Sequence, residues 1–312
     1  MKKILTIDGG GIKGVFTLAF LASIEQKLKQ PINKYFDLIV GTSTGGIIAL
    51  GLGKGFSATE LLEFYIELGE KVFGGNRFLR WIKHWGLAKY NNEVLTKSLY
   101  KKFGNSRLGE SKVRLVIPSQ ALETGDVYLY KTAHNKRFKE DYKKTMVEIA
   151  LATSAAPSYF PSFRSRTGAV MVDGGTYANN PIVIAAVEAT GILNWSSDQI
   201  EILSVGSTFE PLNINLAKKI ALGKSYWAVK SLDLIMKGQS SAAIGMAKHL
   251  SNYHVTRIDE VVSNNKFKLD SIESMNDLKG LGSIKGRNEF QNIEQIFFSQ
   301  SASQFEPIYK LK

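Results

Sequence analysis

A serine with the surroundings of a nucleophile stands at Ser43, within the stretch 41–45 that reads GTSTG. The apolar run 36–40 before it predicts a buried strand, and apolar residues resume at 47–50 as a helix. G-x-S-x-G between a strand and a helix is the setting of a nucleophile elbow, in which the tight turn needs small neighbours. Free N–H groups at the start of that helix would stabilise negative charge on a substrate oxygen. The alternative is a glycine-rich connection in which Ser43 only caps the helix.

A second glycine-rich loop follows the strand predicted at residues 3–7, and it reads DGGGIKG over residues 8–14. Its glycines also fit the dinucleotide fingerprint G-x-G-x-x-G, but that fingerprint expects an acidic residue closing the second strand, where this chain reads VGTS. We therefore interpret the loop as a cradle of backbone N–H groups for an oxyanion or a phosphate. Lys13 would add positive charge to it, or would simply be a solvated lysine at a helix start.

A serine hydroxyl needs a base at neutral pH, and one candidate is Asp173. Asp173 follows the strand predicted at 169–172 and precedes two glycines. Because the carboxyl ends of parallel strands gather at one edge of a sheet, we expect Asp8, Ser43 and Asp173 to reach the same edge. A carboxylate in contact with the serine could accept its proton directly. For Asp8, fixing the glycine loop through hydrogen bonds is the expected role.

Histidine is the other candidate base, and the chain has four: His84, His134, His249 and His254. The last two follow Asp173, so the order Ser…Asp…His of an α/β-hydrolase is present. Neither stands in a glycine-flanked loop after a clear strand, where that histidine is expected. We interpret both as solvated or helix-end residues.

The elements that must position these residues alternate between strands and helices up to about residue 210. This order predicts an α/β fold with a mostly parallel central sheet and helices on both faces. Beyond Pro211 the pattern becomes helical and no interdomain linker is visible, so we expect one domain over 1–312, with the motifs in 1–210 and a helical elaboration in 211–312. The predicted elements there are a helical region at 213–250 with breaks at Gly223, Gly238 and Gly245, edge strands at 253–258 and 266–269, a basic glycine-rich loop at 279–287 and a last helix at 288–299.

Composition limits the class of protein further. With 312 residues, 44% hydrophobic and 22% charged, the chain can bury a large core and is not globally disordered. The absence of cysteine excludes disulfides, thiol catalysis and cysteine-ligated metal sites. Asp8 comes too early for a signal-peptide core and no apolar run approaches ~20 residues, so a cytoplasmic location is expected. The net charge of +12 suits anionic membranes, nucleic acid or phosphorylated ligands without choosing among them.

Two regions are candidates for contact with anionic partners. Residues 73–90 are dense in aromatic and cationic side chains, which is typical of a membrane-interface segment or a lid, and equally of a loop packed over the core. The helical region beyond the motifs carries lysines that could hold an anionic activator, although a solvated helical face is the simpler interpretation. These are Lys218, Lys219, Lys224, Lys230 and Lys237.

Taken together, four motifs resemble the patatin-like phospholipase family. They are the loop 8–14, the stretch 41–45, ATSAAP at 152–157 and DGG at 173–175, in matching order and spacing over about residues 3–205. The resemblance implies a three-layer sandwich with helices on both faces of the sheet. It also implies a catalytic dyad of Ser43 as nucleophile and Asp173 as base. The oxyanion hole would be formed by the backbone N–H groups of Gly9, Gly10 and Gly11.

The same resemblance implies a phospholipase A type of acyl hydrolase that acts on membrane glycerophospholipids through an acyl-enzyme, with no metal or organic cofactor. Many relatives carry arginine where this chain has Lys13, and lysine keeps the charge but lacks the bidentate fork that suits a phosphate. Compact bacterial members include antiphage effectors switched on by cyclic oligonucleotides. The resemblance therefore allows such an activator and a homo-oligomer. Peripheral contact with a membrane is expected, and binding of a nucleic acid polymer is not.

The sequence leaves two other functions open. The first is an α/β-hydrolase esterase with a Ser-His-Asp triad that uses His249 or His254. The second is a non-catalytic module in which the glycine loop and the basic surface hold an anionic lipid or nucleotide. Replacing all four histidines separates the dyad from the triad, and a binding module would hold its ligand equally well as Ser43→Ala.

Overall fold

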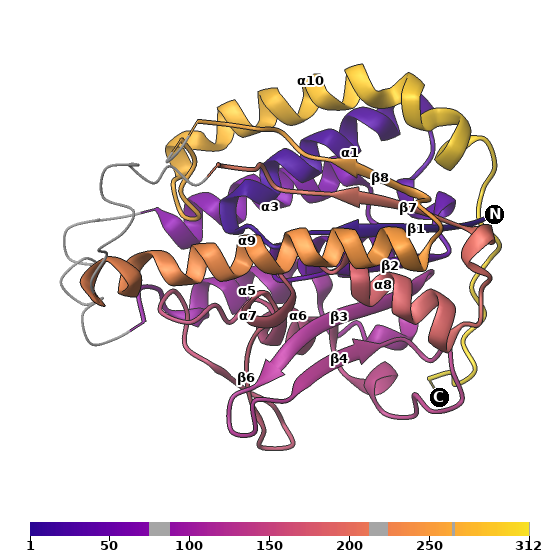
Figure 1. Cartoon of the computed structure of the whole chain (residues 1–312). Coiled ribbons are helices and arrows are strands. Elements are labelled where there is room, and N and C mark those ends of the chain that lie inside the picture. Colours follow the sequence, from indigo (N-terminus) through magenta and orange to yellow (C-terminus); the bar gives the residue numbers. More distant parts are fainter. Residues whose placement is uncertain (75–87, 212–223, 264–265, 312) are drawn as a thin grey trace.

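The computed structural model describes residues 1–74, 88–211, 224–263 and 266–311 (Figure 1). Its described strands form one sheet in the order β5-β6-β3-β2-β1-β7-β8, with β4 also paired to β3. The strands are β1 (Lys2–Ile7), β2 (Leu38–Gly41), β3 (Arg114–Ala121), β4 (Val127–Lys131), β5 (Phe163–Arg164), β6 (Val170–Asp173), β7 (Ile200–Val205) and β8 (Val255–Ile258).

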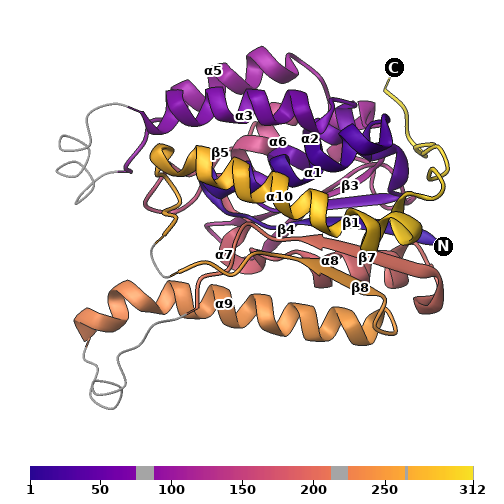
Figure 2. The same cartoon turned by 90° about the horizontal axis from the view of Figure 1, so that it is seen from above.

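Helices cover both faces of this sheet, and Figure 2 shows α9 on one side of it with α3 and α5 on the other. Within the described residues no helix combines the length and apolar content that crossing a bilayer requires. The helices are α1 (Gly14–Leu28), α2 (Thr44–Lys54), α3 (Ala58–Phe73), α5 (Asn92–Phe103), α6 (Met146–Thr153), α7 (Gly175–Ala178), α8 (Ile182–Val187), α9 (Lys224–Leu250) and α10 (Met275–Ile293).

The two faces arise from the alternation of side chains along each strand. Leu5 and Ile7 of β1 join one buried cluster with α1, α2, α3 and α10, whereas Ile4 joins a second cluster with α8 and α9. In β2, Ile39 points to the first cluster, while Leu38 and Val40 point to the second. Because both faces of the sheet are buried, the sequences of these strands are continuous apolar runs and do not alternate between apolar and polar residues.

The predicted fold class is confirmed. Five neighbouring strands, β3, β2, β1, β7 and β8, run parallel. The sheet becomes antiparallel beyond them, because β4 and β6 both pair antiparallel with β3, and β5 with β6. The sequence pattern did not predict that change of direction.

Helices α3 and α5 begin at capping residues whose types and spacing are visible in the sequence. Ser57 and Glu60 form the capping box of α3, in which the Ser57 hydroxyl accepts from the Glu60 N–H at 3.1 Å and the Glu60 carboxylate accepts from the Ser57 N–H at 2.8 Å. Asn91 caps α5 by accepting from the Glu93 N–H at 2.9 Å. These signals are local, which is why they could be recognised in the sequence.

Three predictions in the C-terminal region are wrong. Helix α9 continues through Gly238 and Gly245 without the expected breaks, and Gly223 lies outside the described residues. Its small residues Ala243 and Ala247 are buried against α8, and this packing outweighs the roughly 1 kcal/mol by which each glycine weakens a helix. The strand expected at 266–269 is also absent, since those residues form turns that pack on the glycine loop.

The prediction of a basic glycine-rich loop at 279–287 is also wrong, because these residues form the middle of α10. Gly282 and Gly286 lie one turn apart on the face that meets α1. A Cβ at Gly282 would collide with the carbonyl oxygen of Phe16, and one at Gly286 would come 2.8 Å from Cβ of Ser23. These glycines allow two helices to approach closely, and they do not form a turn.

Candidate active site

Ser43 occupies a strained turn between β2 and α2. Its backbone has φ 55° and ψ −121°, a conformation that non-glycine residues rarely adopt, and α2 begins at the next residue. The turn also brings α2 against β1, because a Cβ at Gly45 would collide with the carbonyl oxygen of Ile7. The GTSTG stretch therefore forms the predicted elbow, and a glycine is sterically required in it.

The structure brings Ser43 and Asp173 into direct contact. Oγ of Ser43 donates to Oδ2 of Asp173 at 2.6 Å, and Oδ1 of Asp173 accepts from the N–H of Gly175 at 2.6 Å. The N–H of Ser43 donates to Oγ1 of Thr153 at 3.0 Å, and Thr153 donates in turn to the carbonyl oxygen of Pro118 at 2.6 Å. The serine is thus held through both its side chain and its backbone.

The Asp173 carboxylate has the properties of a base. It is 4% exposed, and this burial raises its pKa to about 6, while the hydrogen bonds from Ser43 and Gly175 lower the pKa and only partly offset the effect. At neutral pH the group is therefore ionised but accepts a proton more readily than an exposed aspartate. A base with a pKa near the working pH is suited to proton transfer.

Asp173 reaches Ser43 by a route that differs from the predicted one. Val116 of β3 pairs with both β2 and β4, and Ser119 pairs with both β4 and β6. Strand β4 therefore takes one edge of β3, while β2 and β6 follow each other along the other edge. Because β6 runs antiparallel, its carboxyl end meets the carboxyl end of β2 head-on, and the expectation of parallel strands was wrong for Asp173.

Hydrogen bonds anchor several backbone groups of the glycine loop. The N–H of Gly9 donates to the carbonyl oxygen of Asn179 at 2.9 Å, and its own carbonyl accepts from Oγ of Ser207 at 3.1 Å. Gly9 therefore cannot donate to an oxyanion in this arrangement, and we correct that part of the predicted hole. The carbonyl of Gly10 accepts from the N–H of Lys13 at 3.1 Å.

Gly11 is anchored by two hydroxyl groups and by its own conformation. Its carbonyl oxygen accepts from Oγ1 of Thr44 at 3.0 Å and from the Tyr65 hydroxyl at 2.8 Å. Its φ of 55° favours glycine, and a Cβ there would collide with the carbonyl oxygen of Leu269. In the part of the chain that the structure describes, no hydrogen bond uses the N–H of Gly10 or Gly11.

Asp8 is fixed by a residue from the C-terminal region. Arg257 of β8 donates to both Asp8 oxygens, at 3.0 and 2.6 Å, and also to Asp259 at 2.8 Å. Burial is the larger effect on Asp8 and raises its pKa to about 6, although the Arg257 guanidinium lowers it. The expected structural role of Asp8 fits this placement, but nothing in the sequence pointed to Arg257.

Lys13 is neither a solvated lysine nor an unpaired cation. Its Nζ lies 2.8 Å from the Glu210 carboxylate, and both side chains are 13% exposed. The two residues line the same cavity as Ser43. Because Glu210 balances its charge, Lys13 offers an anionic ligand less attraction than the sequence suggested.

The described histidines are bound away from Ser43. Nε2 of His134 lies 2.8 Å from the Glu188 carboxylate, and Nδ1 of His254 lies 2.6 Å from that of Glu201. His249 is paired with Tyr253, and His84 lies outside the described residues. Among the described residues, no histidine lines the cavity that contains Ser43 and Asp173.

That cavity has a volume of about 1160 Å³ and opens beside the elbow. Much of its wall is apolar, with residues from α2, α3 and the segment after α6, and its other side comes from α9 and residues 267–270. Ile47, Leu68, Val72, Phe160 and Phe267 are among the apolar residues that line it. The space is large enough for a long hydrophobic group beside the serine.

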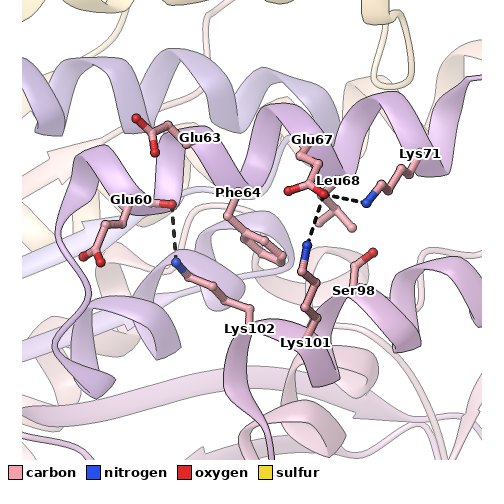
Figure 3. A pocket seen from close by; sticks show the side chains of 9 residues that line it. All are labelled: Glu60, Glu63, Phe64, Glu67, Leu68, Lys71, Ser98, Lys101 and Lys102. Carbon is pink, nitrogen blue, oxygen red and sulfur yellow. Dashed lines mark hydrogen bonds and ion pairs between the residues drawn. The ribbon is translucent and has the colours of Figure 1, made fainter.

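A second cavity, of about 380 Å³, lies between α3 and α5 (Figure 3). Charged side chains of both signs line it, and they largely pair with one another. Glu67 lies 2.5 Å from Lys71 and 3.5 Å from Lys101, and Nζ of Lys102 donates to the backbone oxygen of Glu60 at 3.4 Å. It contains none of the predicted site residues.

The two candidate regions for anionic partners are only partly described. Of the aromatic and cationic segment 73–90, residues 75–87 lie outside the described part, and at its ends the Phe73 and Tyr90 rings pack at 5.1 Å. Of the lysines named above, Lys237 lines the Ser43 cavity. Lys218 and Lys219, and the side chains of Lys224 and Lys230, lie outside the described part.

The profile of the family described as "Patatin-like phospholipase" matches residues 5–186. The chain belongs to this family. The patatin-like chain is therefore a hydrolase of the phospholipase class, as the resemblance implied.

Two relatives whose sequences align over most of this chain support the assignment. A protein of Pseudomonas aeruginosa named "cGAMP-activated phospholipase" is 32% identical over 89% of this chain and 86% of its own length. One of the same name from Escherichia coli is 31% identical over 97% of this chain and 94% of its own. Among solved structures, VipD from Legionella pneumophila aligns with a TM-score of 0.49 and 11% identity over 93% of this chain and 67% of that one.

Proposed function

We propose that this patatin-like phospholipase hydrolyses fatty-acyl esters of membrane glycerophospholipids with Ser43 as nucleophile and Asp173 as base. The observation that supports this most strongly is the 2.6 Å hydrogen bond from Oγ of Ser43 to the Asp173 carboxylate. A triad would place a histidine between these groups. His249 and His254 are bound elsewhere, which favours the dyad over the esterase alternative.

The proposed reaction has two steps. In the first, Oγ of Ser43 attacks the acyl carbonyl carbon while Asp173 accepts the hydroxyl proton. The tetrahedral adduct then expels the lysophospholipid alkoxide, which takes that proton, and an acyl-enzyme remains. In the second step Asp173 takes a proton from water, the hydroxide attacks the acyl-enzyme, and the fatty acid leaves as Ser43 regains its proton.

Gly10 and Gly11 are the proposed donors to the oxyanion. Their N–H groups make no hydrogen bond within the described residues, although the neighbouring backbone groups of the loop are paired, and both residues line the cavity with Ser43. Preorganised donors of this kind typically contribute ~10²–10³ each to the rate. Gly9 is not included, because its N–H is bound to Asn179.

A cyclic dinucleotide is the proposed activator. It is suggested by the relatives named "cGAMP-activated phospholipase", which align over most of this chain. Peripheral contact with the membrane follows from the proposed substrate. Formation of a homo-oligomer, a cytoplasmic location and a role in antiphage defence stay predictions.

The test measures release of fatty acid from mixed phospholipid vesicles, with and without cGAMP. Wild type and a variant that lacks all four histidines are expected to be active, and Ser43→Ala and Asp173→Ala to be reduced by at least about 10³. A histidine-free protein that is folded but inactive would favour the triad instead. Inactive wild type under both conditions, with Ser43→Ala binding vesicles equally well, would indicate a binding module.

A further inference from the structure

The guanidinium of Arg257 joins the C-terminal region to the first residue of the glycine loop. It lies on β8, and β7 separates β8 from β1, so the side chain must cross one strand to reach Asp8. On the way it donates to Oγ of Ser204 in β7 at 2.8 Å. Its two terminal nitrogens then bind one Asp8 oxygen each, at 3.0 and 2.6 Å. A lysine could not make this forked contact.

A second carboxylate, that of Asp259, accepts from the same guanidinium. Oδ2 of Asp259 accepts from Arg257 at 2.8 Å, while its Oδ1 accepts from the N–H groups of Thr208 and Glu260 at 3.1 and 3.0 Å. Arg257 therefore donates to two carboxylates, those of Asp8 and Asp259, and only 19% of its side chain is exposed. This leaves it little freedom to move, so it can act as a rigid support.

The support acts where the chain leaves β1. The N–H of Asp8 is bound to Val205 at 3.1 Å, and the next N–H, of Gly9, to Asn179. Beyond the loop, the N–H of Ile12 donates at 2.8 Å to the carbonyl oxygen of Leu269, which also belongs to the C-terminal region. Both ends of the loop are thus fixed by residues that come 170 or more positions later in the chain, while the N–H groups of Gly10 and Gly11 lie between them.

We infer that Arg257 is a positioning residue for catalysis, which holds the Gly10 and Gly11 N–H groups in place through Asp8. The inference rests on the proposed oxyanion role of these glycines. An oxyanion donor must lie at hydrogen-bond distance from the developing negative charge. A small shift of the loop therefore reduces the stabilisation of the transition state more than it reduces the affinity for the substrate. Arg257 touches neither the substrate carbonyl nor Ser43 in this role.

The test compares Arg257→Gln, Arg257→Lys and wild type with p-nitrophenyl butyrate in the presence of cGAMP. We expect Arg257→Gln to lower kcat by about 10–100-fold and to leave KM within about twofold, because one misplaced donor has effects of up to this size. Arg257→Lys keeps the charge but loses the fork and should lie between the two. Hydrogen exchange of the peptide 8–12 should be faster in Arg257→Gln.

Arg114→Gln is the matched control. Arg114 begins β3 at the opposite end of the same sheet, where it donates to the backbone oxygen of Asp37 at 3.3 Å. Its loss should lower stability without changing kcat or the exchange of peptide 8–12. The inference fails if Arg257→Gln is folded and has a kcat within twofold of wild type, or if Arg114→Gln lowers kcat equally.

Two further variants keep the test decisive. Removing Arg257 alone leaves Asp8 and Asp259 without their cation. The double variant Asp8→Asn/Arg257→Gln is therefore measured as well, and it should show the same loss of kcat. Normal kcat in that variant would overturn the inference. Ser43→Ala is measured alongside them. If it hydrolyses the ester like wild type, the proposed function is wrong, whereas an inactive Ser43→Ala with normal Arg257 variants refutes the positioning role alone.

Discussion

At the scale of single residues, two opposing effects set the pKa of Asp173. Its burial destabilises the charged form, and the two hydrogen bonds from Ser43 and Gly175 offset this effect only in part. The result is a carboxyl group whose pKa is raised to about 6 beside the candidate nucleophile. Such a shift is what a general base needs, and it also links activity to pH.

The pH dependence of the reaction follows from this shift. Below about pH 6 Asp173 is protonated and cannot accept the Ser43 proton, so kcat/KM should fall on the acid side with a midpoint near 6. A pH series with p-nitrophenyl butyrate measures it. A histidine would titrate in the same pH range. The histidine-free variant must therefore show the same fall of kcat/KM on the acid side.

Asp8 needs a separate control, since burial raises its pKa to about 6 as well and it lines the same cavity. In Asp8→Asn the fall of kcat/KM at acid pH should keep its midpoint even though kcat is lower. If kcat/KM of Asp8→Asn no longer falls at acid pH, Asp173 is not the titrating base.

At the scale of elements, α10 shows how glycine spacing can be misread. Gly282 and Gly286 lie on its buried face against α1, whereas Gly280 is exposed and has no atom within 4 Å of its Cβ position among the described residues. The same residue type therefore serves close packing at two positions and only weakens the helix at the third. Glycine clusters are also typical of turns and loops, so the sequence alone favoured a loop for this stretch.

Alanine substitutions in α10 should separate these two roles. Gly282→Ala should lower the free energy of unfolding by about 1–3 kcal/mol, because its methyl group collides with Phe16 and Ala19 of α1. The matched variant Gly280→Ala should raise it by up to about 1 kcal/mol through better helix propensity. Urea unfolding followed by circular dichroism measures both, and equal stability of the two variants would contradict this packing.

At the scale of the whole molecule, the described residues beyond 211 pack against the part of the chain that carries the motifs. Strand β8 pairs with β7, and α10 packs along α1. Arg257 and Leu269 fix the two ends of the glycine loop. These contacts support the prediction of one domain.

Truncation tests that prediction. A chain of residues 1–210 loses β8 and α10, which uncovers apolar residues of α1 such as Phe16 and Phe20 that are fully buried in the complete protein. We expect it to lack a cooperative unfolding transition and to lose reaction of Ser43 with a fluorophosphonate probe. A truncated chain that unfolds cooperatively and labels like the full chain would show that 1–210 is an independent domain.

The sequence by itself determined the local features of this protein: strand–glycine–helix at both loops, the capping of α3 and α5, the alternating α/β order, and Ser43 and Asp173 as the pair to examine. These features depend on residues a few positions apart, so they can be recognised in a single sequence. Only the tertiary structure decided that β6 approaches Ser43 antiparallel, that Asn179 occupies the Gly9 N–H, and that Arg257 holds Asp8 across 249 positions. Contacts of that range are set by how the layers pack, and they leave no periodic signal in the sequence.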